Sequence, residues 1–382
     1  MSGEEGLPEP DCAPGAPHPR ATAQIFGHAE AEQGFLEAWV TGRLHHGWLI
    51  TGPRGVGKAT LAWRIARFLL ATPDPQDDGL FGAPPPPDSL TIDPEHPVAR
   101  RMLALSEPGL FLLRRGGAGS TESEQDKARA EGRFSTDIRV SEVRKLKDFF
   151  ALSAADGGRR VVIVDAADEL NTNAANAILK LLEEPPARTT LLLVCHQPAR
   201  LLPTIRSRCR TLRLSPLGTE DMQAALDQAG VTPAQGDLPG LAELSGGSVG
   251  TAIRLDQLDG LALYAELIAI LSTDPRPDRN RLLALSNSCA GKAAEDRLDL
   301  VLSLTEHLTA RLARTGALGV APTVQAAKGE CTLLSRLSQD PARARAWAEA
   351  AQRGLDRARH ARAVNIDPAA LVTDLFLGLA RV

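Results

Sequence analysis

Residues 48–70, WLITGPRGVGKATLAWRIARFLL, decide the fold, because they combine a buried strand, a glycine-rich turn and a helix in that order. We predict that the strand ends over residues 48–51, that the turn occupies 52–58 and that the helix covers 60–70. A strand followed by a glycine-rich turn and a helix is typical of α/β proteins that bind phosphate groups.

The turn has the spacing of a phosphate-binding loop. Gly52, Gly57 and Lys58 match the pattern G-x-x-x-x-G-K, with Gly55 inside it. In this pattern backbone N–H groups and a helix N-terminus hold phosphate oxygens, while the lysine neutralises their charge. The alternative is a glycine turn that only joins a strand to a helix, and the complete Gly-Lys spacing disfavours it. We therefore predict a P-loop that can bind phosphate.

The residue after the lysine is unfavourable for a metal ion. P-loops normally have Ser or Thr here to hold Mg²⁺, and this chain has Ala59. Thr60 offers a hydroxyl one position later, but one residue along a helix turns the side chain by about 100°. The loop is thus predicted to be able to hold phosphate and to hold the metal poorly, and Thr60 is a further candidate contact if a nucleotide binds.

Composition limits the class of protein. The 382 residues suffice for two or three domains, and we find no apolar run of about 18 residues that would predict a membrane span. Residues 1–22 are acidic and proline-rich without the apolar segment of a secretory signal, so we predict a disordered tail and a cytoplasmic protein. The net charge of −4 argues against a generally basic DNA-coating protein. Five scattered cysteines support neither a disulfide framework nor a zinc cluster.

Further strands and helices alternate along the first part of the chain. Apolar runs predict strands at 110–113, 161–165, 189–195 and 211–214, and a helix at 173–184 separates two of them. This alternation predicts a doubly wound parallel sheet, the α/β class.

The remaining segments set the predicted domain boundaries. Two polar stretches, 72–97 and 114–137, are predicted to be a surface excursion and a mobile insertion. After about residue 217 only helical patterns follow. We predict a core over 23–216, a helical lid over 217–257 and an all-helical domain over 258–382.

A carboxylate ends the second central strand. Asp165 follows a β-branched run, at the place where P-loop proteins position the residue that orients Mg²⁺. The next residue, Ala166, cannot act as a base toward water. Asp168 and Glu169 lie further along and would have to reach back to replace that base.

Four segments together resemble the clamp-loader branch of the AAA+ proteins. They are GPRGVGKAT at 52–60, VVIVDAADELNTNAANAILKLLEEPP at 161–186, LLLVCHQPARLLPTIRSRC at 191–209 and the glycine-serine helix start at 246–252. The resemblance implies an AAA+ P-loop core, a helical lid and a C-terminal collar that joins the subunits of a hetero-pentamer. It also implies partners: the ATPase subunits (gamma or tau), the delta subunit, the sliding clamp and, through the assembly, primed DNA.

Three departures from the branch concern ATP hydrolysis. An active clamp-loader ATPase would have Ser or Thr, Asp-Glu and a lid arginine where this chain has Ala59, Ala166 and Gly250. His196 stands near a sensor position that usually holds a small polar residue. The resemblance therefore implies that ATP or ADP, if bound, is not hydrolysed here. No structural zinc is expected either, since the stretch 72–97 has no cysteine where many relatives carry a four-cysteine module.

One functional residue of the branch is intact. In the family the arginine of the motif at 207–209, here Arg208, reaches ATP held by the neighbouring subunit. A guanidinium suits this role because it is always protonated and binds phosphate oxygens in a bidentate way. The alternative is that Arg208 is one more solvated arginine.

Two functional hypotheses follow. The first is a non-catalytic stator that lends Arg208 to an adjacent ATPase subunit and helps to load the clamp. The rival is an active AAA+ ATPase subunit, gamma/tau-like, in which Thr60 and Asp168 have taken over the missing roles. A P-loop kinase of small molecules is less favoured, because of the long helical tail and the trans-acting motif.

Overall fold

The computed structural model describes residues 8–73, 86–152, 158–273, 277–291, 294–363 and 366–382. The chain divides into two compact units, residues 1–231 with 248–250, and residues 232–247 with 251–382. Residues 1–7 of the predicted tail and residues 74–85 of the predicted surface excursion lie outside the described residues. The predicted boundaries of the core, lid and collar stay a prediction.

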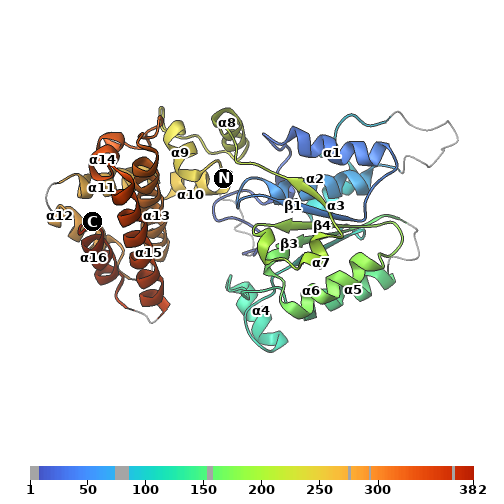
Figure 1. Ribbon diagram of the computed structural model, residues 1–382. Helices are drawn as coiled ribbons and strands as arrows, with labels where there is room; N and C mark the ends of the chain where they lie inside the picture. Colours follow the sequence, from blue (N-terminus) through green and yellow to red (C-terminus); the bar gives the residue numbers. More distant parts are fainter. Residues whose placement is uncertain (1–7, 74–85, 153–157, 274–276, 292–293, 364–365) are drawn as a thin grey trace. The chain divides into compact units, whose positions relative to one another are not determined.

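The first unit is built on a five-stranded parallel sheet (Figure 1). Its strands are Gly47–Thr51 (β1), Leu110–Arg114 (β2), Arg160–Asp165 (β3), Thr189–Cys195 (β4) and Arg210–Arg213 (β5). Their order across the sheet is β2-β3-β4-β1-β5. This confirms the predicted parallel α/β sheet, because all neighbouring strands run the same way.

Helices cover both faces of the sheet, with α1 and α2 on one face and α5 and α6 on the other (Figure 1). They are Ala29–Val40 (α1), Lys58–Ala71 (α2), Val140–Leu152 (α5) and Thr172–Glu183 (α6). Successive residues of β1 point to opposite faces. The ring of Trp48 lies 4.9 Å from that of Phe35 in α1, whereas Leu49 packs in the apolar cluster that includes Ile178 of α6. Burial on both faces explains why β1, β3 and β4 are mainly apolar runs, whereas three of the four residues of the edge strand β5 are exposed.

Four shorter helices occur in the described part of the first unit. They are Pro97–Leu103 (α3), Glu122–Ala130 (α4), Pro203–Arg206 (α7) and Thr219–Gln228 (α8). Helix α4 corrects the prediction that 114–137 is only a mobile insertion. Thr121 and Glu124 form a capping box at its start, and a bridge joins Gly117 to Phe134. The polar composition concealed the helix, although the pattern T-x-x-E is a capping signal.

The prediction of a disordered tail over residues 1–22 is wrong for its described part, because residues 8–22 are ordered. It contains a short 3₁₀ helix, Pro19–Ala21, and acidic side chains that form ion pairs with Arg114 at the end of β2. The composition is that of a disordered segment. Its partners, however, lie about a hundred residues away in sequence, so the local pattern could not reveal them.

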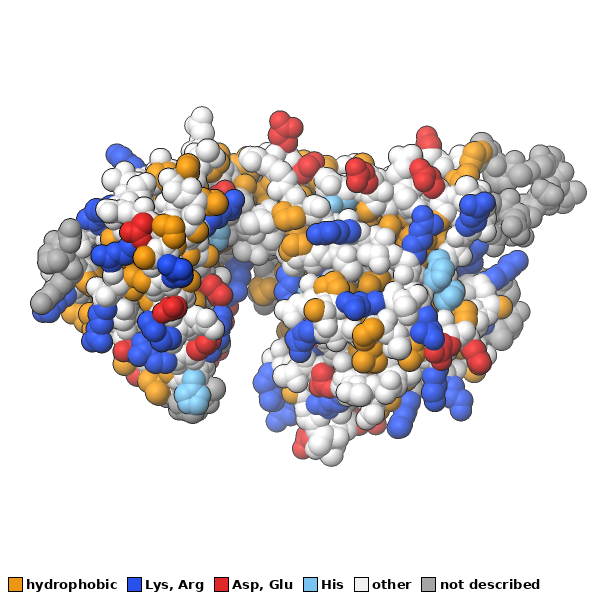
Figure 2. Space-filling model, viewed as in Figure 1, with side chains coloured by type: hydrophobic (Ala, Val, Ile, Leu, Met, Phe, Trp, Pro, Cys, Tyr) orange, Lys and Arg blue, Asp and Glu red, His pale blue; other side chains and the backbone are white. Residues whose placement is uncertain are grey.

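The second unit is all-helical in its described residues, as predicted for the C-terminal region. Its helices are Leu238–Ser245 (α9), Val249–Gln257 (α10), Gly260–Ser272 (α11), Arg279–Ser288 (α12), Glu295–Leu318 (α13), Glu330–Leu337 (α14), Pro341–Ala363 (α15) and Pro368–Leu379 (α16). The first two residues of α10, Val249 and Gly250, belong to the first unit. None of the described helices is long and apolar enough to cross a membrane. On the face shown in Figure 2, basic side chains are interspersed with acidic and neutral ones over both units.

A charged network lies inside this helical unit. Glu330 at the start of α14 is fully buried and accepts hydrogen bonds from the Tyr264 hydroxyl (2.6 Å) and the Ala326 amide (2.7 Å). The Nε of Arg311 in α13 lies 2.6 Å from the same carboxylate, and Arg311 also pairs with Glu243 in α9. The network therefore joins α9, α11, α13 and α14.

Candidate functional site

The P-loop joins β1 to α2 at the carboxyl edge of the sheet. Gly52 has φ 148°, and a Cβ added there would lie 2.4 Å from the backbone oxygen of Leu214, so the close approach requires glycine. Gly57, the N-cap of α2, is left-handed with φ 102°. The first amides of α2 have no partner inside the helix and are suited to bind phosphate. The predicted loop geometry is therefore present.

Lys58 faces the loop itself. Its side chain is buried, and its Nζ donates to the carbonyl oxygens of Gly52 (2.8 Å) and Pro53. Burial lowers the pKa of Lys58 to about 8, although the charge of Asp165 acts in the opposite direction. A bound phosphate would have to draw the ammonium group away from these carbonyls.

The residues around the loop do not suit Mg²⁺. Ala59 has no oxygen ligand, and Thr60 lies one position further along the first turn of α2. Asp165 ends β3, where its register partner is Val194 of β4. Burial, together with the charges of Asp11 and Glu169, raises the pKa of Asp165 to about 7. Near neutral pH this carboxyl is protonated in much of the population, which makes it a poor metal ligand.

The two acids that could replace the missing base are engaged elsewhere. Asp168 is buried and accepts the backbone amides of His196 (2.8 Å) and Gln197 (3.1 Å), one on each oxygen. Glu169 pairs with Arg54 of the P-loop (2.8 Å) and with Arg115 (3.1 Å). Asp168 therefore fixes the loop after β4, and Glu169 neutralises two arginines.

His196 is unsuited to bind phosphate through a positive charge. Its Nδ1 is buried without a hydrogen-bond partner among the described residues. Burial and the positive charge of Lys58 lower its pKa to about 4, so the ring is neutral at physiological pH.

The start of α10 contacts the P-loop directly. The amide of Gly250 donates to the oxygen of Gly55 (3.3 Å), and a Cβ added at Gly55 would lie 2.2 Å from the Ser248 hydroxyl oxygen. Gly250 is the position where the resemblance expects a lid arginine. The backbone reaches the loop, but the charged group that would contact a nucleotide is missing.

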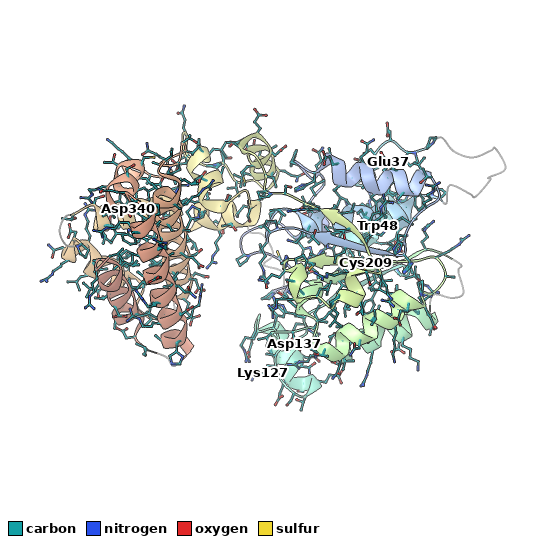
Figure 3. All side chains as sticks on the ribbon, viewed as in Figure 1. Glu37, Trp48, Lys127, Asp137, Cys209 and Asp340 are labelled. Atoms are coloured by element: carbon teal, nitrogen blue, oxygen red, sulfur yellow. The ribbon has the colours of Figure 1, made fainter. Side chains whose placement is uncertain are left out.

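Arg208 lies near the amino-terminal end of β1, whereas the P-loop follows the carboxyl end of that strand. It precedes β5, and its backbone oxygen would be 3.2 Å from a Cβ added at Gly47, the first residue of β1. The P-loop follows the last residue of β1, five residues on, which is about 16 Å along a strand. Figure 3 labels Trp48 and Cys209, which mark the Arg208 end. The structure thus groups Gly52, Gly55, Gly57, Lys58, Thr60 and Asp165 and leaves Arg208 apart from them.

Two contacts hold the Arg208 side chain, which is 38% exposed. Its Nη1 donates to the oxygen of Thr204 (3.0 Å), and its Nη2 lies 3.0 Å from Oε1 of Glu183 at the end of α6. Exposed ion pairs of this kind contribute about 0–1 kcal/mol, so a phosphate can compete with Glu183. Sequence reasoning did not identify Glu183, since no local signal links it to Arg208.

Comparisons with known proteins place this chain. A family model described as "DNA polymerase III, delta subunit" matches residues 27–218. Over 253 residues the chain is 31% identical to DNA polymerase III subunit delta' of Escherichia coli, covering 66% of this chain and 67% of that protein. The chain belongs to the DNA polymerase III delta' family. This assignment and the parallel sheet confirm the predicted AAA+ fold class.

Other relatives differ in their sequence identity to this chain and in the share of each protein that the match covers. DNA polymerase III subunit delta' of Pseudomonas aeruginosa is 38% identical over 215 residues, and DNA polymerase III subunit gamma/tau of Mycobacterium tuberculosis is 28% identical over 245 residues. These matches cover 55% and 63% of this chain, and 55% and 37% of the relatives. The chain thus spans about half the length of the first curated relatives it matches. A solved gamma subunit-related protein from Thermotoga maritima has a TM-score of 0.38 at 15% identity and covers 91% of this chain and 98% of that one.

Replacing Asp165 with asparagine should stabilise the protein at high pH. Because the pKa of Asp165 is raised in the folded state, ionisation of its carboxyl lowers the free energy of unfolding. This loss is absent below the usual pKa of 3.8 and is complete above about pH 7. We expect Asp165→Asn to be about 1–3 kcal/mol more stable than the unmodified chain at pH 8, with a difference near zero at pH 4. Urea unfolding at both pH values measures it. Asp126→Asn, a change at an exposed carboxylate, serves as control. An equal gain of Asp165→Asn at both pH values would show that ionisation of Asp165 does not destabilise the fold.

Proposed function

We propose that the chain is the delta' subunit of a DNA polymerase III clamp loader, a stator that does not hydrolyse ATP and lends Arg208 to ATP held by a neighbouring subunit. One contrast carries the proposal. The chain's own P-loop lacks a metal ligand at Ala59, an acid at Ala166 and a lid arginine at Gly250, while the retained Arg208 lies at the opposite end of the sheet. An arginine placed there cannot serve its own nucleotide and suits a site across a subunit edge.

Energetics support this division of roles. An arginine that contacts the transferring phosphate is worth about 10³- to 10⁵-fold in rate, and loss of the metal ligand and the base adds further cost. The engaged positions of Asp168 and Glu169 disfavour the rival hypothesis that Asp168 replaces the base. ATP or ADP, if it binds, would be held by Lys58, the loop amides and the first turn of α2 that includes Thr60.

The proposed partners follow from the family. They are the ATPase subunits (gamma or tau) and the delta subunit in a hetero-pentamer, joined through the helical C-terminal domain, and through the assembly the sliding clamp and primed DNA. The mixed surface charge in Figure 2 fits contact with DNA through the assembly better than a basic DNA-binding face of this chain alone.

The isolated chain should not turn over ATP. We expect the rate with Mg²⁺ and ATP to equal that of the Lys58→Ala variant prepared in the same way, because the unmodified site lacks the groups that stabilise the transition state. A steady-state phosphate-release assay measures this. Turnover that requires magnesium and disappears in Lys58→Ala would instead establish the rival, an active ATPase.

A further inference from the structure

An N-terminal segment lies beside the P-loop. We call residues 8–22 the strap; it precedes the residues 27–218 that match the family model (dark blue in Figure 1). Arg115 donates to the backbone oxygen of Pro10 (3.1 Å), and Arg67 of α2 donates to that of Arg20 (2.7 Å). The His18 ring packs edge-on against Trp63 of α2, 5.8 Å between centres. The strap therefore runs from the end of β2 to α2.

Two strap carboxylates are held by arginines. Glu9 accepts hydrogen bonds from Arg20 (2.7 Å) and Arg114 (2.7 Å). The Asp11 side chain is 1% exposed and pairs with Arg114 as well. Burial alone would raise the pKa of Glu9, but the hydrogen bonds from Arg20 and Arg114 overcome it and lower the pKa to about 2. The pKa of Asp11 is likewise below its usual value, so both groups are charged at neutral pH.

This cluster is an ion-pair network and not a metal site. Glu9, Asp11 and His18 each offer a ligand atom, and these atoms lie within 4.8 Å of one another. The Nδ1 of His18, however, accepts the Arg20 amide (3.1 Å), so in the neutral ring the proton is on Nε2, which faces the two carboxylates. Arg20 and Arg114 already balance both negative charges.

Two chains of contacts connect the strap to the P-loop. Arg115, which holds Pro10, also pairs with Glu169, and Glu169 pairs with Arg54 inside the P-loop. On the other side, Ala13 lies 3.8 Å from the Cβ position of Gly250, whose amide donates to Gly55. The negative charge of Asp11 is one of the causes that raise the pKa of Asp165, after burial. The strap is thus linked to the P-loop at Arg54 and at Gly55.

We propose that the strap is a built-in competitor of nucleotide: Glu9 and Asp11 anchor it on Arg114 at the end of β2, and the segment between them and Ala13 covers the mouth of the P-loop. The inference rests on the proposed function and deepens it, because it gives a means by which a loop with intact Gly-Lys spacing excludes nucleotide. Nucleotide binds only when the strap opens, so its apparent Kd equals the intrinsic Kd divided by the open fraction.

The test releases the strap in the full-length chain. In Glu9→Gln/Asp11→Asn the amides are nearly isosteric but cannot form the ion pairs with Arg114 and Arg20. We expect a fluorescent ADP analogue, followed by anisotropy, to bind this variant at least about ten-fold more tightly than the unmodified chain, as an open fraction of one tenth or less requires. Hydrogen–deuterium exchange should show faster exchange of amides in residues 9–22.

Matched controls separate release of the strap from a change in net charge. Asp126→Asn/Glu131→Gln removes two exposed carboxylates of α4 and its C-cap, each paired with an arginine, and should leave ADP affinity unchanged. Arg114→Gln removes the shared partner from the other side and should also raise the affinity. Lys58→Ala in the released background should abolish the gain.

The outcomes are distinct. Equal ADP affinity in the released variant and the unmodified chain overturns the proposal, and so does a gain that Lys58→Ala does not remove. Tighter binding without ATP turnover supports both the strap and the proposed function. Tighter binding accompanied by magnesium-dependent turnover supports the strap and contradicts the proposed function.

Discussion

Replacing Arg208 with alanine is expected to lower ATP turnover at the neighbouring ATPase subunit by about 10³-fold. Among the described residues, Glu183 and the Thr204 carbonyl hold the guanidinium, so it can move to a phosphate offered by another chain. The total rate of the reconstituted assembly should fall to what its other sites supply. A phosphate-release assay with clamp and primed DNA measures the rate, and size-exclusion chromatography checks that the subunits stay together.

Arg206→Ala provides the matched control. Arg206 is an exposed arginine at the end of α7, two residues away, and it donates to the Pro198 oxygen (3.3 Å). Its removal changes the local charge equally and should leave turnover unchanged. An equal loss in both variants would indicate a general charge effect at this edge, and no loss in Arg208→Ala would remove the proposed trans role.

Replacing Glu330 with alanine is expected to destabilise the helical unit by about 3–5 kcal/mol. The change leaves the buried Tyr264 hydroxyl and the Ala326 amide without their acceptor and removes the partner of the Arg311 Nε. Urea unfolding gives the total loss of stability. Hydrogen exchange should locate it in α11, α13 and α14, the helices that the contacts of Glu330 join.

Glu306→Ala is the control for this second change. Glu306 pairs with Arg359 at 3.1 Å, but both side chains are more than half exposed, so the pair should contribute about 0–1 kcal/mol. A similar cost for the two variants would contradict the view that burial makes the Glu330 network important. Because the proposed collar joins subunits, Glu330→Ala should also weaken assembly, whereas Glu306→Ala should not.

The sheet and the P-loop could be predicted because their signals are local. The residues of β1, β3 and β4 are continuous apolar runs, and the Gly52 to Lys58 spacing specifies a backbone shape with little help from distant residues. Asp165 could be placed beside the loop because the carboxyl ends of parallel strands share one edge.

The ordered strap could not be predicted, because its stability comes from residues far along the chain. Glu9 and Asp11 look like any acidic tail until Arg114 at the end of β2 is brought to them. Contacts of this range need the tertiary fold, and the same holds for the pairing of Arg208 with Glu183 and for the two backbone amides on Asp168.

Side-chain direction was the other missing information. The motif identified Lys58, but only the structure shows its ammonium group turned onto the Gly52 and Pro53 carbonyls. Spacing gives the position of a group along the chain and does not give the rotamer that its surroundings select.

In the proposed function, Arg208 of this chain contacts ATP held by a neighbouring subunit, and the chain's own P-loop hydrolyses no ATP. One comparison tests it most directly: ATP turnover by reconstituted assemblies in which only this chain carries either Lys58→Ala or Arg208→Ala. We expect an unchanged rate with Lys58→Ala and a large loss with Arg208→Ala. A loss with Lys58→Ala and an unchanged rate with Arg208→Ala would contradict it.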